Sequence, residues 1–210
     1  MKDDPFKIKV CGMKDPENIK QLVKLKPDYI GFILYPYSKR YVGDNFRVEV
    51  KFPGNIRKVG VTVNALFNDV VRWANILKLD YVQLQGDESP EYCRDLKGFD
   101  INIIKSFGIN ESFDFSVLND YMEVCEFFLF DTKTPLHGGS GKKFEWGKLS
   151  EYELQKFFFL SGGIGPDDAS NIKKNKDLPI EAIDINSKFE TEPAMKDINL
   201  LKSFIKEIRE

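Results

Sequence analysis

Eight short apolar runs, rich in β-branched and aromatic residues, recur along the chain and constrain its fold more than any other feature. They span residues 7–12, 29–34, 58–63, 81–86, 101–107, 127–132, 157–163 and 182–187. Their starts lie roughly 20 to 30 residues apart, which is too far for hairpins and suits strand–helix units. Runs such as 29–34 and 127–130 are apolar throughout, as strands covered by helices are. The pattern predicts an α/β protein.

Helical periodicity falls between most of these runs. At 15–25 the apolar residues lie largely on one face, with Asp15 placed as the N-cap and Pro16 in the first turn. Further helical patterns, the second of them weaker, cover residues 68–79, 165–175 and 195–208. Between the second and third strands, residues 36–55 predict a loop and a short helix.

Eight strands that alternate with helices could form an open doubly wound sheet or a closed barrel. An even series of eight favours the (β/α)8 TIM barrel, and 210 residues lie near the compact end of its size range. No low-complexity segment or Pro/Ser-rich linker interrupts the series. We therefore expect a single domain over residues 1–210.

Composition restricts the classes of partner. The chain is 42% hydrophobic and 30% charged, as folded globular proteins are, and its net charge of -2 does not indicate a nucleic-acid partner. No apolar stretch approaches the length of a membrane span, and the N-terminus lacks the apolar region of a signal peptide. We therefore expect a cytoplasmic protein with no membrane partner.

The three cysteines, Cys11, Cys93 and Cys125, match no metal-binding spacing, and His137 is the only histidine. Neither a zinc site nor a disulfide framework is expected. Cys93 and Cys125 lie in segments with a helical pattern, and we expect them to be small buried hydrophobic residues. Cys11 differs because it ends the first strand just before a glycine. It could be a core residue or a reactive thiol.

In a (β/α)8 barrel the active site lies at the carboxyl ends of the strands. Those ends carry two potential proton carriers, Cys11 and Asp131. Polar residues and glycines accompany them at the other strand ends, namely Asn64, Gln85, Gly86, Thr132, Ser161, Gly162, Gly163, Asp184, Asn186 and Ser187.

Loops beside these strand ends carry further candidates. The stretches "LSGGIG" and "DINS" follow the last two strands, where such barrels commonly bind phosphate, so Gly162, Gly163 and Ser187 are candidate phosphate ligands. The glycine-rich segment 137–146 could be a solvated loop or a mobile lid beside Asp131. Arg40, in the loop after the second strand, could be a solvating charge or a bidentate contact for a carboxylate.

Seven motifs, each on a different predicted strand, resemble the phosphoribosylanthranilate isomerase family of tryptophan biosynthesis. The motifs are "KVCGM", "GFILYPYSKRYV", "VGVTVN", "YVQLQGDE", "FLFDTKTPLHGGSGKKFEW", "LSGGIGPDDA" and "AIDINSKFETEPAMKD", in that order and over nearly the whole chain. The family is a (β/α)8 barrel, which agrees with the independent count of strands.

The resemblance implies an Amadori rearrangement of N-(5-phosphoribosyl)anthranilate, without a metal or cofactor. It implies that Cys11 is the general base and Asp131 the general acid, and that Arg40 holds the anthranilate carboxylate. The loops with Gly162, Gly163 and Ser187 would hold the phosphate, and Asp184 would lie near the reacting centre. The sequence leaves a monomer and a homodimer open.

Three positions depart from the family pattern. Gln85 stands where histidine is frequent, Lys188 where glycine is common, and Ala194 where glycine is usual. The isomerase of histidine biosynthesis performs the same rearrangement on a bis-phosphorylated substrate, but it resembles a duplicated half-barrel with two aspartates and two phosphate sites. A phosphosugar-binding barrel without turnover is another alternative, which the presence of Cys11 and Asp131 disfavours.

Overall fold

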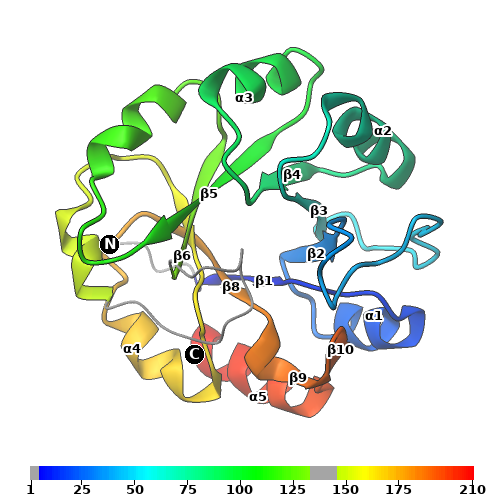
Figure 1. Ribbon diagram of the computed structural model, residues 1–210. Coiled ribbons are helices and arrows are strands. Elements are labelled where there is room, and N and C mark those ends of the chain that lie inside the picture. The colour runs from blue at the N-terminus through cyan, green and yellow to red at the C-terminus, as the bar shows by residue number, and fades with distance from the viewer. Residues whose placement is uncertain (1–4, 133–145) are drawn as a thin grey trace.

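The computed structural model describes residues 5–132 and 146–210, and its centre is a closed barrel of eight parallel strands in chain order (Figure 1). The barrel closes because β1 pairs with both β2 and β8, so that Lys9 lies opposite Tyr29 on one side and Asp184 on the other. The predicted (β/α)8 barrel is confirmed. The strands are β1 Lys7–Val10, β2 Tyr29–Ile33, β3 Arg57–Thr62, β4 Tyr81–Leu84, β5 Ile103–Ile109, β6 Phe127–Thr132, β7 Phe158–Leu160 and β8 Ile180–Ile185.

Helices surround the ring of strands (Figure 1). As predicted, the Asp15 side chain caps the first of them by accepting a hydrogen bond from the Asn18 backbone N–H (2.8 Å). The α-helices are α1 Pro16–Val23, α2 Phe67–Leu77, α3 Pro90–Lys97, α4 Ala169–Lys173 and α5 Ile198–Arg209. In the described part of the chain, 3-10 helices cover Phe115–Tyr121, Trp146–Glu151, Pro166–Asp168 and Ser187–Phe189.

The short helix predicted within residues 36–55 is wrong, because that segment contains turns and one isolated bridge between Ile33 and Tyr41. The apolar residues at 46, 48, 50 and 52 alternate with polar ones, and all four pack against the core. This two-residue period is typical of extended chain and does not suit a helix. The predicted helical setting of Cys125 is also wrong, since Cys125 lies in irregular chain before β6.

Two helix boundaries also differ from the prediction. The pattern at 165–175 divides into a 3-10 turn and the short helix α4. The C-terminal helix begins at Ile198, because the residues before it form an unpredicted hairpin of β9 Glu190–Glu192 and β10 Met195–Lys196. Asp197 then caps α5 by accepting from the backbone N–H groups of Asn199 and Leu200, both at 3.0 Å.

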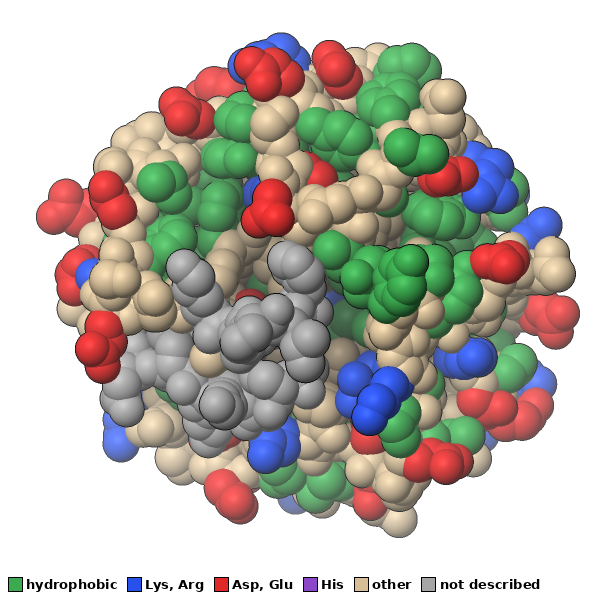
Figure 2. All heavy atoms as spheres, in the orientation of Figure 1, with side chains coloured by type: hydrophobic (Ala, Val, Ile, Leu, Met, Phe, Trp, Pro, Cys, Tyr) green, Lys and Arg blue, Asp and Glu red, His purple; other side chains and the backbone are tan. Residues whose placement is uncertain are grey.

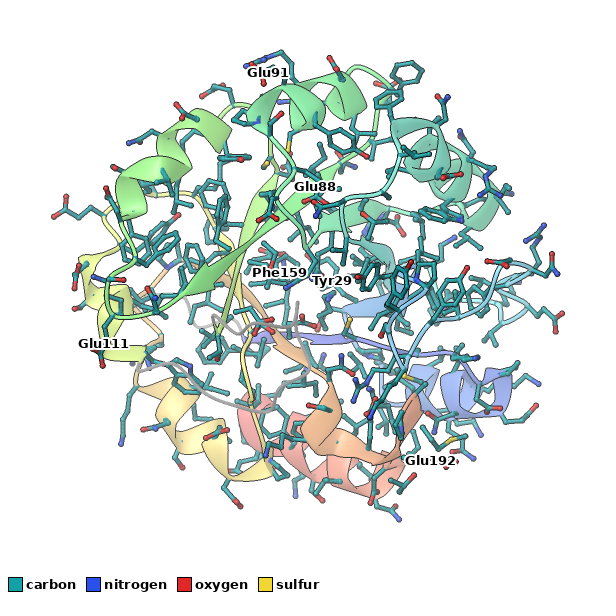
Figure 3. The ribbon with its side chains drawn as sticks, viewed as in Figure 1. Tyr29, Glu88, Glu91, Glu111, Phe159 and Glu192 are labelled. Atoms are coloured by element: carbon teal, nitrogen blue, oxygen red, sulfur yellow. The ribbon has the colours of Figure 1, made fainter. Side chains whose placement is uncertain are left out.

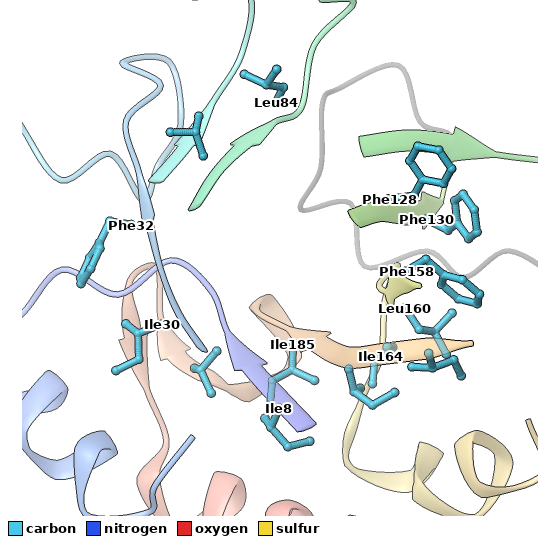
Figure 4. Close-up of a cluster of buried hydrophobic side chains, with 14 of the residues drawn as sticks. Ile8, Ile30, Phe32, Leu84, Phe128, Phe130, Phe158, Leu160, Ile164 and Ile185 are labelled. Atoms are coloured by element: carbon cyan, nitrogen blue, oxygen red, sulfur yellow. The ribbon is translucent and has the colours of Figure 1, made fainter. Parts of the chain in front are cut away.

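Apolar side chains are buried in two layers. Inside the ring, aromatic and aliphatic side chains fill the barrel, and Tyr29 and Phe159 lie at its centre whereas Glu91 and Glu111 lie at the periphery (Figure 3). The second, larger layer lies between strands and helices, and Figure 4 shows part of it around Phe128 and Phe130. Burial of each such side chain contributes about 1.5–3 kcal/mol. The apolar barrel interior supports the polar pocket at the strand ends.

Acidic and basic side chains are interspersed around the rim in the view of Figure 2, in keeping with the small net charge. Among the helices of residues 5–132 and 146–210, none is long and apolar enough to cross a membrane.

Candidate active site

A pocket at the carboxyl ends of the strands brings the predicted site residues together. Cys11, Arg40, Asp131, Gly162, Gly163, Asp184 and Ser187 all line it. Other lining residues include Ile33, Tyr35, Gln83, Gln85, Ser161 and Asn186. The prediction placed these side chains by one rule, that the strands of a barrel end on the same side.

Cys11 follows β1 and faces the barrel interior, since the side chains of Ile8 and Val10 point outward into the main core. Its backbone N–H donates to the Ile185 carbonyl (2.9 Å), which extends the pairing of β1 with β8. Gly31 on β2 makes room for the thiol, because a Cβ there would lie 2.8 Å from Sγ. The thiol position therefore depends on a glycine in the neighbouring strand.

Burial raises the pKa of the Cys11 thiol, and the Asp184 carboxylate adds to this effect. The ammonium groups of Lys9 and Lys196 act in the opposite direction and stabilise the thiolate. The net effect is a raised pKa, so Cys11 is mainly a thiol at neutral pH when the pocket holds no substrate. A thiolate forms here only at a free-energy cost, which the two lysines reduce.

Lys9, two residues before Cys11 on the same strand face, is fully buried and lies at the centre of a hydrogen-bonded array. Its Nζ donates to Asp184 Oδ1 (2.9 Å) and to Gln83 Oε1 (2.8 Å). Gln83 Nε2 donates to Gln85 Oε1 (2.5 Å), and Gln85 Nε2 donates to Asp131 Oδ2 (3.3 Å). Burial alone would lower the pKa of Lys9, but Asp184 and Cys11 hold it above its ordinary value. Lys9 is therefore a buried cation at neutral pH.

Asp131 lies near the end of β6, on the side of the barrel away from β1. Its Oδ1 accepts a hydrogen bond from the Thr132 backbone N–H (2.7 Å). Burial raises the pKa of Asp131 to about 6, and the nearby Asp184 carboxylate contributes, against the hydrogen bonds from Thr132 and Gln85 and the charge of Lys9. Asp131 thus keeps a proton to a higher pH than an ordinary aspartate.

Arg40 is not an exposed solvating charge, because its side chain is only 14% exposed and pairs with Glu190 on the β9–β10 hairpin. Arg40 Nε donates to both Glu190 oxygens (2.9 and 3.0 Å), and Nη2 donates to Oε2 (2.6 Å). Lys196 Nζ reaches the same carboxylate (2.5 Å). Gly12, with φ +77°, lets Arg40 pack closely, because a Cβ there would lie 2.8 Å from its Cδ.

The glycines after β7 adopt a conformation that other residues rarely take. Gly162 has φ +96° and Gly163 has φ +65°. A Cβ on Gly162 would lie 2.5 Å from Thr132 Oγ1, so the chain approaches β6 closely here. Ser187, at the start of the 3-10 helix that follows β8, lines the same pocket as these glycines. Backbone N–H groups in such glycine turns suit an anionic ligand.

The remaining sequence predictions concern other parts of the chain. Cys93 and Cys125 are buried, as expected. The predicted lid at 137–146, with His137, lies outside the described residues apart from Trp146. In the described part of the chain, no group of three or more His, Cys, Asp or Glu side chains is arranged to hold a metal ion.

Four residues of the site escaped sequence analysis, namely Lys9, Gln83, Glu190 and Lys196. A signal was present for two of them. Lys9 precedes Cys11 by two residues and Gln83 precedes Gln85 by two, so each shares a strand face with a residue that was identified. Glu190 and Lys196 lie on the unpredicted hairpin, and the sequence carried no comparable signal for them.

Fold and pocket together define a (β/α)8-barrel enzyme with its active site at the carboxyl ends of the strands. A family model described as N-(5'-phosphoribosyl)anthranilate (PRA) isomerase matches residues 8–207. The N-(5'-phosphoribosyl)anthranilate isomerase of Parabacteroides distasonis is 42% identical over 205 residues, which cover 96% of this chain and 92% of that protein. The chain belongs to the N-(5'-phosphoribosyl)anthranilate isomerase family.

Solved structures agree with this assignment. A phosphoribosyl anthranilate isomerase in complex with reduced 1-(o-carboxyphenylamino)-1-deoxyribulose 5-phosphate has a TM-score of 0.80 and 28% identity, with 97% of this chain and 98% of that chain covered. Monomers generated from the dimeric Thermotoga maritima enzyme have a TM-score of 0.80 and 29% identity, with the same coverage.

Proposed function

We propose that this chain catalyses the Amadori rearrangement of N-(5-phosphoribosyl)anthranilate to 1-(2-carboxyphenylamino)-1-deoxyribulose 5-phosphate, a step of tryptophan biosynthesis. The observation that carries the proposal is that Cys11 and Asp131, two groups able to move protons, line one pocket in a member of this isomerase family. The reaction is an internal redistribution of hydrogen, so it needs no external oxidant or reductant.

In the first step Asp131 donates its proton to the ribose ring oxygen. The bond between that oxygen and the anomeric carbon breaks, and the nitrogen lone pair forms the imine. The pKa of Asp131, raised to about 6 by burial, keeps part of the population protonated near neutral pH. An ordinary aspartate would supply far less of the acid form.

In the second step the Cys11 thiolate removes the proton from the carbon next to the imine. The electron pair of that C–H bond forms a carbon–carbon double bond, and the C=N π pair returns to the protonated imine nitrogen. The resulting enolamine tautomerises to the ketone. Lys9 and Lys196 favour the thiolate through their charges, although the pKa of Cys11 stays raised in the empty pocket. The acid and base forms are restored when Cys11 loses the proton it gained and Asp131 regains one.

The same proposal assigns the binding contacts. Glu190 occupies the Nε–Nη2 edge of Arg40, and within residues 5–132 and 146–210 no hydrogen bond engages Nη1. The Nη1–Nη2 edge can therefore receive the anthranilate carboxylate as a bidentate pair. The backbone at Gly162 and Gly163, together with Ser187, receives the phosphate, and Asp184 keeps Lys9 in place beside the reacting centre.

We further propose that residues 1–210 act as one domain, as a monomer or homodimer in the cytoplasm. The support is one barrel that includes every described strand from β1 to β8, membership of a biosynthetic enzyme family, and the dimeric Thermotoga maritima relative. Light scattering coupled to size-exclusion chromatography distinguishes the two assembly states.

The test of function is to follow anthranilate fluorescence while the purified protein acts on freshly prepared N-(5-phosphoribosyl)anthranilate. The proposal predicts a decrease faster than spontaneous decay and a phosphorylated ketose product identified by mass spectrometry. Decay at the uncatalysed rate would refute it.

A further inference from the structure

The hydrogen bonds from Lys9 to Asp131 have a fixed direction. The ammonium group of a charged Lys9 can only donate, so Gln83 must present Oε1 to it (2.8 Å). Gln83 then has only its NH2 group for Gln85, and Gln85 must accept through Oε1 (2.5 Å). Gln85 in turn has only its NH2 group for Asp131 Oδ2 (3.3 Å). The cation thus determines the orientation of both amides.

This direction has a consequence at Asp131. Oδ2 accepts from Gln85, and Oδ1 accepts from the Thr132 backbone N–H (2.7 Å). When Asp131 is protonated, its proton cannot lie on either of those two lone pairs, because each faces a hydrogen of another donor. The proton must occupy one of the other lone pairs of the carboxyl group.

Neither amide titrates, so the arrangement does not change with pH as long as Lys9 stays charged. Lys9 is fully buried and is held charged by its ion pair with Asp184 (2.9 Å). Gln83 is buried, so bulk water has little access to the middle of the array. A histidine in place of Gln85 could accept or donate toward Asp131 according to its tautomer, whereas Gln85 under this constraint can only donate.

We propose that Lys9 is a positioning residue that, through Gln83 and Gln85, keeps the acid proton of Asp131 off the side facing Gln85 and available to the substrate. The role of that proton as the catalytic acid rests on the proposed function. The orientation of the Gln83 and Gln85 amide groups does not, because it is a property of the protein alone. Lys9 and Asp184 are the charged groups that act on Asp131 from β1 and β8. Cys11, which follows β1, and Tyr35 and Arg40, which follow β2, line the same pocket.

The informative variant is Gln83→Glu. A carboxylate at position 83 still accepts from Lys9 but cannot donate, so Gln85 must turn its NH2 group toward position 83 and its Oε1 toward Asp131. Protonated Asp131 then donates to Gln85. We expect its titration midpoint to rise by about one pH unit, because the amide now favours the protonated form and a negative charge has been added nearby.

The measurement is the pH titration of the Asp131 carboxyl carbon by 13C NMR in the substrate-free protein, assigned with Asp131→Asn. Gln83→Met, which is similar in size and adds no charge, removes the link from Lys9 to Gln85. Gln85 is then free to turn its Oε1 toward Asp131, so the midpoint should rise, by less than in Gln83→Glu. Gln85→Met, at the pocket mouth, removes the donor altogether and should also raise the midpoint. Since no substrate is present, these results do not depend on catalysis.

Turnover supplies the second readout. With the acid proton directed toward Gln85, Gln83→Glu should lower kcat at least ~10-fold, more than Gln83→Met does. A purely structural role predicts equal losses of Tm for the two variants at position 83 and an Asp131 midpoint that does not move in Gln83→Met. The inference is overturned if Asp131 in Gln83→Met titrates at or below the wild-type midpoint or, where that variant does not fold, if Asp131 in Gln83→Glu does so.

Discussion

Replacement of Asp131 by asparagine should abolish the acid function. It should also change stability, so that the free energy of unfolding of the variant rises relative to that of wild type as the pH rises. Burial raises the pKa of Asp131 to about 6 in the folded protein, whereas an unfolded chain has an ordinary aspartate pKa of ~3.9. A group whose pKa is raised by folding stabilises the folded state only while it is protonated in both states. The stability is lost as the pH rises through the folded-state pKa.

The size of the effect follows from linkage. Ionisation of Asp131 costs the folded state about 3 kcal/mol at about pH 8 and about 1 kcal/mol at about pH 4.5. Asparagine cannot ionise, so the variant avoids this cost. Its altered contact with Gln85 adds a contribution that does not depend on pH. The difference in free energy of unfolding between variant and wild type should therefore shift by about 2 kcal/mol in favour of the variant between those two pH values.

Urea unfolding of both proteins at the two pH values measures this shift. Asp114→Asn is the control, because hydrogen bonds with Ser116 lower the pKa of that exposed carboxyl group. Its removal should change stability with the opposite sign, as the contribution of Asp114 is present at higher pH and is lost as the pH falls. A stability difference for Asp131→Asn that stays constant with pH, or that moves toward wild type as the pH rises, would refute the reasoning.

Substitutions at three further positions test other parts of the structure. Arg40→Ala should weaken substrate binding by about 1.5–3 kcal/mol, seen as a higher KM. Arg40→Lys should restore little of this binding, because an ammonium group lacks the planar pair of donors. A wild-type kcat/KM in both variants would contradict the contact with the carboxylate. Gly163→Val should raise KM strongly, since valine resists φ +65° and holds the backbone away from the phosphate, and an unchanged KM would exclude this role. Ala194→Gly should raise the free energy of unfolding by up to ~1 kcal/mol in urea titrations, because Ala194 has φ +70°, a conformation that strains residues other than glycine. A loss of stability would show that the backbone is not strained here.

The barrel and its main site residues were predictable because both follow from short-range patterns. Eight evenly spaced apolar runs specify the strands, and each strand end places one or two side chains at the pocket. Cys11 and Asp131 were found in this way. Lys9 and Gln83 were not identified, although each lies two residues before Cys11 or Gln85 and therefore shares a strand face with it. A buried lysine in a strand interior is rare enough to have been a signal.

Other features depend on contacts that no local pattern encodes. Arg40 and Glu190 are 150 residues apart, and their ion pair exists only because the β9–β10 hairpin folds over the β2–β3 loop side of the barrel. The sequence analysis predicts a loop and a short helix over residues 36–55. There the alternation from Phe46 to Phe52 instead gives an extended chain against the core. Tertiary packing decides both cases.

The central claim, that Cys11 is the catalytic base, is tested most directly by measuring kcat of Cys11→Ser. Serine keeps the shape of the side chain but is a far weaker acid than the thiol, so kcat should fall at least ~100-fold, the low end for loss of a general base. Tm should stay close to wild type, and a phosphorylated product analogue should still bind. A kcat near that of wild type, with or without a lower Tm, would contradict the account and make Cys11 a core residue.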